Sequence, residues 1–133
     1  MTMQDTENSI IDDLNELGDI LDRSEFLVRL GKQYQGMPER EKSNDNLIKD
    51  CQTTTWLKVE WKEASEGLQL VMKADSQSLL VKGALALIDE IYNGRTKKEA
   101  DSYKCRLIEE KCFMGLFSDR QRLGIKSIIS KLS

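Results

Sequence analysis

Apolar and polar positions in the first part of the chain follow the period of an α-helix. Apolar residues recur at spacings of four, three and four over residues 10–21, which predicts a helix that Ser9 can cap. A second apolar face runs over residues 26–30 and stops at Gly31, which is followed by a lysine, a common C-terminal signal. The pattern predicts two short helices, or one helix kinked at Gly18.

The pattern changes in the middle of the chain. Residues 34–46 are almost wholly polar and contain the only proline, so they predict a surface connection. Residues 55–62 and 68–75 alternate apolar and polar side chains with a period of two, which is typical of β-strands. The turn 63–67 between them indicates an antiparallel hairpin. We expect a third strand from Leu47-Ile48 or elsewhere.

A long helix is predicted after the hairpin. Its apolar residues run from Leu79 to Ile91, Asp75 or Ser76 can cap its start, and Asn93-Gly94 ends it.

Two capping-box sequences follow, at 96–99 and 118–121, and predict a short helix and an amphipathic C-terminal helix. Strands grouped mid-chain with helices on both sides give an α+β fold, with an antiparallel sheet of about three strands packed against helices. The length fits a single domain over residues 1–133.

Composition excludes several classes of function. The net charge of −3, from 20 basic and 23 acidic residues, lacks the basic excess of nucleic-acid binding. No apolar run approaches the roughly 18 residues of a membrane span, and the N-terminus does not have the pattern of a signal peptide, so we expect a cytoplasmic protein without a membrane partner. The absence of histidine removes the usual general base and the commonest metal ligand. Scattered glycines form no phosphate-binding loop.

Three cysteines remain as candidates for chemistry. In the cytoplasm they would stay reduced, and an odd number cannot form a closed set of disulfides. Cys51 lies between the polar connection and the first strand, where another molecule can reach a thiol, although cysteine is also a common buried apolar residue. Lys49 would favour the thiolate and Asp50 would oppose it. On a continuous helix Cys105 and Cys112 would lie about 10 Å apart, too far for a disulfide or a shared metal ion.

Two longer stretches carry a family resemblance. They are DCQTTTWL at residues 50–57 and KADSQSLLVKGALALIDEIYNGRT at residues 73–96. In this order and at this separation they resemble the SufE family of sulfur-acceptor proteins. The chain departs from the family pattern at Asp50, where glycine is usual, at Thr53, where serine is usual, and at Gln121, where arginine is expected.

The resemblance implies a compact α+β fold similar to the IscU scaffold proteins, and a relay of sulfur. A pyridoxal-phosphate cysteine desulfurase of the SufS type forms a persulfide on its own cysteine. Cys51 would attack the outer sulfur and pass it to an iron–sulfur scaffold such as SufBCD. The protein would be an accessory activator of the desulfurase rather than a stand-alone enzyme, and would bind no cofactor and no metal of its own.

The resemblance and the local chemistry also suggest residues that bind the partner or shape the site: Asp50, Gln52, Thr53, Asp75, Ser76, Lys82, Gln121 and Arg122. Each has a structural reading as well, as a loop contact, a strand start, a helix cap or a solvated charge. Two other functions stay open. The three cysteines could build a metal or iron–sulfur scaffold of the IscU kind, or the chain could be a noncatalytic interaction module.

Overall fold

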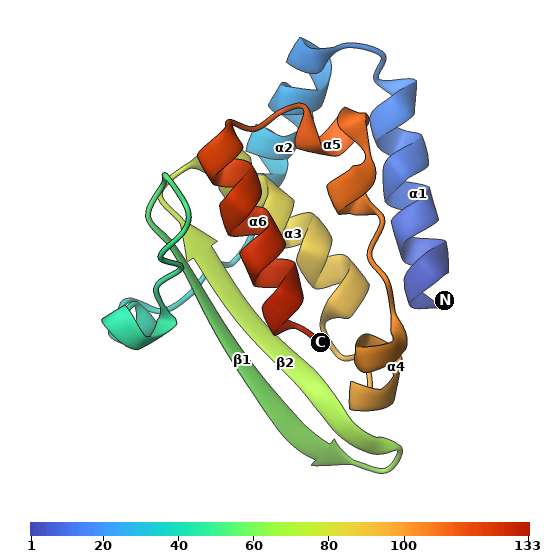
Figure 1. Ribbon diagram of the computed structural model, residues 1–133, viewed down its shortest axis with the longest axis vertical. Helices are drawn as coiled ribbons and strands as arrows, with labels where there is room; N and C mark the ends of the chain where they lie inside the picture. Colours follow the sequence, from blue (N-terminus) through green and yellow to red (C-terminus); the bar gives the residue numbers. More distant parts are fainter.

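The computed structural model describes residues 1–133 and confirms the predicted α+β fold. In Figure 1 a β-hairpin lies along one side of the molecule and the helices cover its inner side. The α-helices are α1 (Met3–Glu16), α2 (Ile20–Gln33), α3 (Leu79–Tyr92), α4 (Lys97–Ser102), α5 (Lys111–Met114) and α6 (Asp119–Lys131). The strands are β1 (Thr55–Ala64) and β2 (Gly67–Ser76), and short 3-10 turns are η1 (Glu39–Glu41), η2 (Asn44–Asn46) and η3 (Leu107–Glu109). None of the helices is both long enough and apolar enough to cross a membrane.

The sheet has two strands rather than about three. β1 and β2 pair antiparallel over their whole length, with Thr55 opposite Ser76. The expected third strand is reduced to one isolated bridge between Leu47 and Trp56. After Ile48, whose amide donates to the Thr55 carbonyl at 2.8 Å, the chain turns away, so no further pairing can form.

Helix α3 occupies the centre of the fold. Eight of its residues are buried, and α1, α2, α6 and β2 all pack against it. The helix is apolar on most of its circumference, as expected for a helix covered on several sides. Its N-cap is Ser78, whose Oγ accepts from the Val81 amide at 3.2 Å. The predicted caps Asp75 and Ser76 are wrong, because β2 continues through both residues.

Helix α1 also begins earlier than its pattern indicated. Thr2, not Ser9, is the N-cap, and it forms a capping box with Asp5. The two capping boxes predicted further along the chain, at α4 and at α6, are confirmed.

Helices α2 and α3 cross in backbone contact at two glycines. A Cβ on Gly83 would lie 2.0 Å from the Leu27 carbonyl oxygen, and one on Gly31 would lie 2.2 Å from the Leu79 carbonyl oxygen. No side chain fits at either position without moving one helix away from the other. The crossing therefore requires glycine on both helices.

Replacing Gly83 with alanine should lower the free energy of unfolding by roughly 1–3 kcal/mol, because the added methyl overpacks the crossing. In an uncrowded helix the same change would raise stability by about 0.5–1 kcal/mol, so the sign is diagnostic. Urea unfolding followed by circular dichroism measures the difference. An unchanged or higher stability would contradict the close crossing.

Candidate functional site

Cys51 lies on the loop that leads into β1, pressed against helix α6. Its side chain is half-buried at the edge of the core, and Figure 1 shows this loop beside α6. A Cβ on Gly124 of α6 would lie 2.5 Å from the Cys51 Cβ and 2.7 Å from its Sγ. The thiol therefore occupies space that exists only because Gly124 has no side chain.

Two side-chain hydrogen bonds tie the loop to the start of α6. Ser118 Oγ donates to Gln52 Oε1 at 2.9 Å, and Gln121 Nε2 donates to Thr53 Oγ1 at 3.3 Å. Gln121 also closes the capping box with Ser118. At this position a glutamine, where arginine was expected, holds the loop and caps the helix.

The other side of the loop is tied to the junction of β2 and α3. The Gln77 amide donates to the Thr54 carbonyl at 3.0 Å, and Ser76 Oγ lies 3.3 Å from the same carbonyl oxygen. Thr55 is fully buried between these groups, with its Oγ1 3.0 Å from Ser76 Oγ and 3.7 Å from Cys51 Sγ. The thiol is thus held between α6 and the start of the hairpin.

Asp75 is buried and Lys82 is partly buried, and the two residues belong to one ion-pair network rather than to an open face. The Asp75 carboxylate lies 3.3 Å from Lys42 Nζ and 3.2 Å from Lys82 Nζ, and it accepts from the amides of Met37 and Ser76. Burial alone would raise the pKa of Asp75, but these hydrogen bonds outweigh it and hold the pKa below its usual value. The network fixes the polar connection onto the end of β2.

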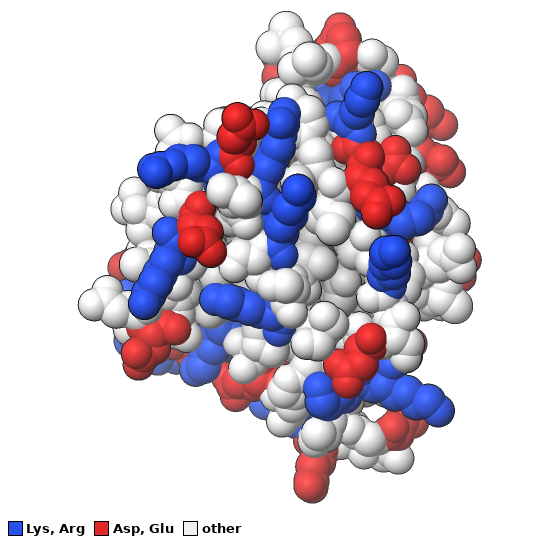
Figure 2. Space-filling model, in the orientation of Figure 1, with Lys and Arg blue, Asp and Glu red and all other residues white.

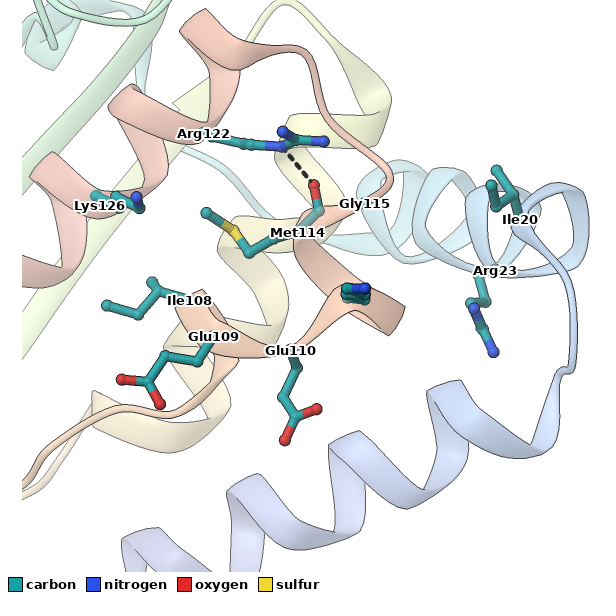
Figure 3. A pocket seen from close by; sticks show the side chains of 10 residues that line it. Ile20, Arg23, Ile108, Glu109, Glu110, Met114, Gly115, Arg122 and Lys126 are labelled. Atoms are coloured by element: carbon teal, nitrogen blue, oxygen red, sulfur yellow. Dashed lines mark hydrogen bonds between the residues drawn. The ribbon is translucent and has the colours of Figure 1, made fainter.

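Arg122 does not face Cys51. Its Nε donates to the Met114 carbonyl at 2.9 Å, and with Lys126 it lines a cavity of about 590 Å³ between α6 and the η3–α5 segment (Figure 3). Gly124 lies two residues from each of them, which is more than half a turn around the helix. Arg122 and Lys126 therefore project away from the thiol.

The surface near Cys51 is polar, and one basic residue of α6, Lys131, lines a pocket there with Lys49 and Asp50. Asp50 and Gln52 are exposed, and Leu123, next to Gly124, is 56% exposed. Basic side chains gather over α6 (Figure 2), whose sequence DRQRLGIKSIISK carries four basic residues and one acidic residue.

The other two cysteines are closed in the core. Cys105 Sγ donates to the buried carboxyl group of Glu7 at 3.0 Å. Burial, followed by the Glu7 contact, raises the pKa of the Cys105 thiol to about 12, and burial also raises the pKa of Cys112. η3 separates the two residues, so they do not share one continuous helix. No group of three or more Cys, Asp or Glu side chains is arranged to hold a metal ion.

Sequence reasoning missed two residues of the site, Ser118 and Gly124, and it gave the Thr53–Thr55 run a role in fixing the loop without a contact to the thiol. The glycine offered one usable signal, because a glycine inside an amphipathic helix often marks close approach of another segment. The capping box gave Ser118 a helical role but could not show its contact with Gln52.

The fold and the site define a class of small α+β protein that keeps one partly exposed thiol on a tethered loop and buries its other thiols. The sequence model of the SufE family, described as an Fe-S metabolism associated domain, matches residues 8–133. The chain belongs to the SufE family, which confirms the resemblance and gives the protein a role in iron–sulfur metabolism.

Curated relatives agree with this assignment. An uncharacterized SufE-like protein of Rhizobium meliloti is 27% identical over 128 residues, covering 94% of this chain and 90% of the relative. A SufE-like protein of Rhizobium etli is 25% identical over 94% of this chain and 85% of its own length. The cysteine desulfuration protein SufE of Wigglesworthia glossinidia brevipalpis is 32% identical over 63 residues, 47% of this chain and 42% of that protein.

Replacing Gly124 with alanine should increase the rate at which iodoacetamide alkylates Cys51 several-fold. The added methyl would lie 2.7 Å from Sγ, and the loop can yield more easily than the core behind the helix. Mass spectrometry of the Cys51 peptide measures the rate. Gly115→Ala is the matched control, because its added methyl would meet the Lys111 carbonyl instead. An unchanged rate in Gly124→Ala would contradict the packing described.

Proposed function

We propose that this protein relays sulfur from a pyridoxal-phosphate cysteine desulfurase of the SufS type to an iron–sulfur scaffold of the SufBCD type. The observation that carries the proposal is the contrast among its thiols: Cys51 is partly exposed on a loop, while Cys105 and Cys112 are buried. Family membership and a relative named as a cysteine desulfuration protein support the same chemistry.

The transfer proceeds by thiol exchange in two steps. The Cys51 thiolate attacks the outer sulfur of the desulfurase persulfide, a new S–S bond forms, and the desulfurase cysteine leaves as a thiolate. In the second step an acceptor thiolate attacks the outer sulfur on Cys51, and the Cys51 thiolate leaves. Three unpaired thiols suit a reducing compartment, so we place this exchange in the cytoplasm.

The tethered loop suits a carrier that must both protect and present its sulfur. Against α6, Cys51 is partly covered from solvent, which limits reduction or oxidation of a bound persulfide. The two bonds from Ser118 and Gln121 each contribute only about 0.5–1.5 kcal/mol net. A docked partner can replace them and draw the loop outward.

The surface around the loop suggests how the desulfurase docks. Asp50 and Gln52 are exposed beside the thiol, and we place them in the contact together with Leu123. Lys49 and Lys131, which line a pocket beside the loop with Asp50, favour an acidic patch on the partner, because complementary charge steers association. Three residues do not contact the partner but fix the segments that hold the loop: Asp75, Ser76 and Lys82.

Intact-protein mass spectrometry tests the relay after incubation with a SufS-type desulfurase and cysteine, without reductant. The wild-type chain should gain sulfur, and Cys51→Ser should gain none because the attacking thiolate is absent. Cys112→Ser is the matched control and should gain sulfur like the wild type, because Cys112 is buried. No added sulfur on the wild type, or sulfur that persists on Cys51→Ser, would contradict the proposal.

A further inference from the structure

The hydroxyl of Thr55 is the one group in the structure that donates a hydrogen bond to the sulfur of Cys51. Thr55 opens β1 with 0% exposure, and its Oγ1 lies 3.7 Å from Sγ. This is within the range of the long hydrogen bonds that sulfur accepts. Thr55 is therefore a neutral donor placed to stabilise a thiolate at Cys51.

Three acceptors lie within reach of the Thr55 hydroxyl, the Thr53 carbonyl, Ser76 Oγ and Cys51 Sγ, and the first two compete with the sulfur for its proton. The Ser78 amide donates to Ser76 Oγ at 3.2 Å, and the Ser76 hydroxyl can donate to Thr55 Oγ1 at 3.0 Å. The Thr55 proton can then go to the Thr53 carbonyl, 2.9 Å away, or to Cys51 Sγ. A neutral thiol is a weak acceptor, whereas a thiolate is a strong one.

We propose that Thr55 is a catalytic hydrogen-bond donor to Cys51, an inference that rests on the proposed sulfur relay. When Cys51 is a thiol, the Thr55 hydroxyl bonds to the Thr53 carbonyl. When Cys51 ionises, the hydroxyl turns to Sγ. The chain of donors from Ser78 through Ser76 strengthens this bond, because successive hydrogen bonds polarise one another.

The hydrogen bond from Thr55 affects the receipt and the delivery of sulfur differently. On receipt, Cys51–S⁻ and a donor R–S–SH give Cys51–S–SH and R–S⁻. On delivery, an acceptor A–S⁻ and Cys51–S–SH give A–S–SH and Cys51–S⁻. A stabilised thiolate forms more readily at neutral pH but is a weaker nucleophile, and it is a better leaving group. Thr55 therefore favours delivery more than receipt.

The primary test is the pH dependence of Cys51 alkylation by iodoacetamide in Thr55→Val and Thr55→Ser. Valine keeps the branched shape without the hydroxyl, and serine keeps the hydroxyl. The midpoint of the profile should rise by about one pH unit in Thr55→Val. The lost hydrogen bond stabilises the charged thiolate, and the free energy of such a bond corresponds to about one pH unit. Alkylation at neutral pH should slow by roughly threefold, since higher intrinsic nucleophilicity offsets part of the lost thiolate. Thr55→Ser should retain the wild-type midpoint.

A second variant keeps the test decisive if Thr55→Val does not fold. Ser76→Ala removes the donor behind Thr55 and should move the midpoint in the same direction by a smaller amount. A wild-type midpoint in Thr55→Val would overturn the proposal, and so would a wild-type midpoint in Ser76→Ala if Thr55→Val does not fold. Alkylation uses neither desulfurase nor cysteine, so this result is independent of whether the sulfur relay itself is correct.

Delivery provides a readout that a purely structural role would not move selectively. Chains carrying a persulfide on Cys51 are mixed with a small thiol acceptor, and loss of the added sulfur is followed by mass spectrometry. Thr55→Val should release sulfur several-fold more slowly than the wild type, because its leaving thiolate is less stabilised. Equal release rates would contradict the role of Thr55 in delivery.

Discussion

The backbone crossing of α2 and α3 sets the position of every other part of the fold. Because glycines meet at Gly31 and Gly83, the two helices approach as closely as their main chains allow. Helix α3 is thereby enclosed, and α1, α6 and β2 pack around it. β2 runs almost directly into α3, so the crossing also determines where the paired end of β1 lies. Thr55 and Cys51 inherit their positions from that junction.

A second close approach, between Gly124 and Cys51, holds the thiol against the rigid core without building it into the core. The loop is held by steric fit and a few individual hydrogen bonds, which can open without unfolding the core. The buried carboxyl group of Glu7 is the opposite case. It accepts from Tyr103, from Cys105 and from two backbone amides, so the segment after α4 is tied firmly to α1. The same fold therefore keeps one thiol available and makes another inert.

Local periodicity predicted the elements that bury one continuous face. The hairpin, α3 and α6 were all predictable because their apolar spacing matches strand or helix geometry. The third strand failed because Leu47 pairs at a single position before the chain turns toward α6. The cap of α3 failed because tertiary pairing extends β2 through Ser76. The apolar and polar pattern of each segment does not show where its pairing with another segment ends.

The site was predictable only in part for the same reason. Cys51 stood out by its place before a strand and by family motifs, but its neighbours Thr55, Ser118 and Gly124 come from segments far apart along the chain or look structural in isolation. Arg122 was predicted to bind the partner or shape the site, yet α6 directs its side chain to the opposite side from the thiol. Side-chain direction on a helix depends on which face the core covers, and one sequence does not specify that face at single-residue precision.

The central claim is that Cys51 accepts sulfur directly from the persulfide of a desulfurase, which frees the desulfurase cysteine for the next turnover. The most direct measurement is the rate of alanine formation from cysteine by a SufS-type desulfurase, with this protein added and no other reductant present. We expect a higher rate with the wild-type chain and the basal rate with Cys51→Ser. Equal stimulation by Cys51→Ser would contradict it.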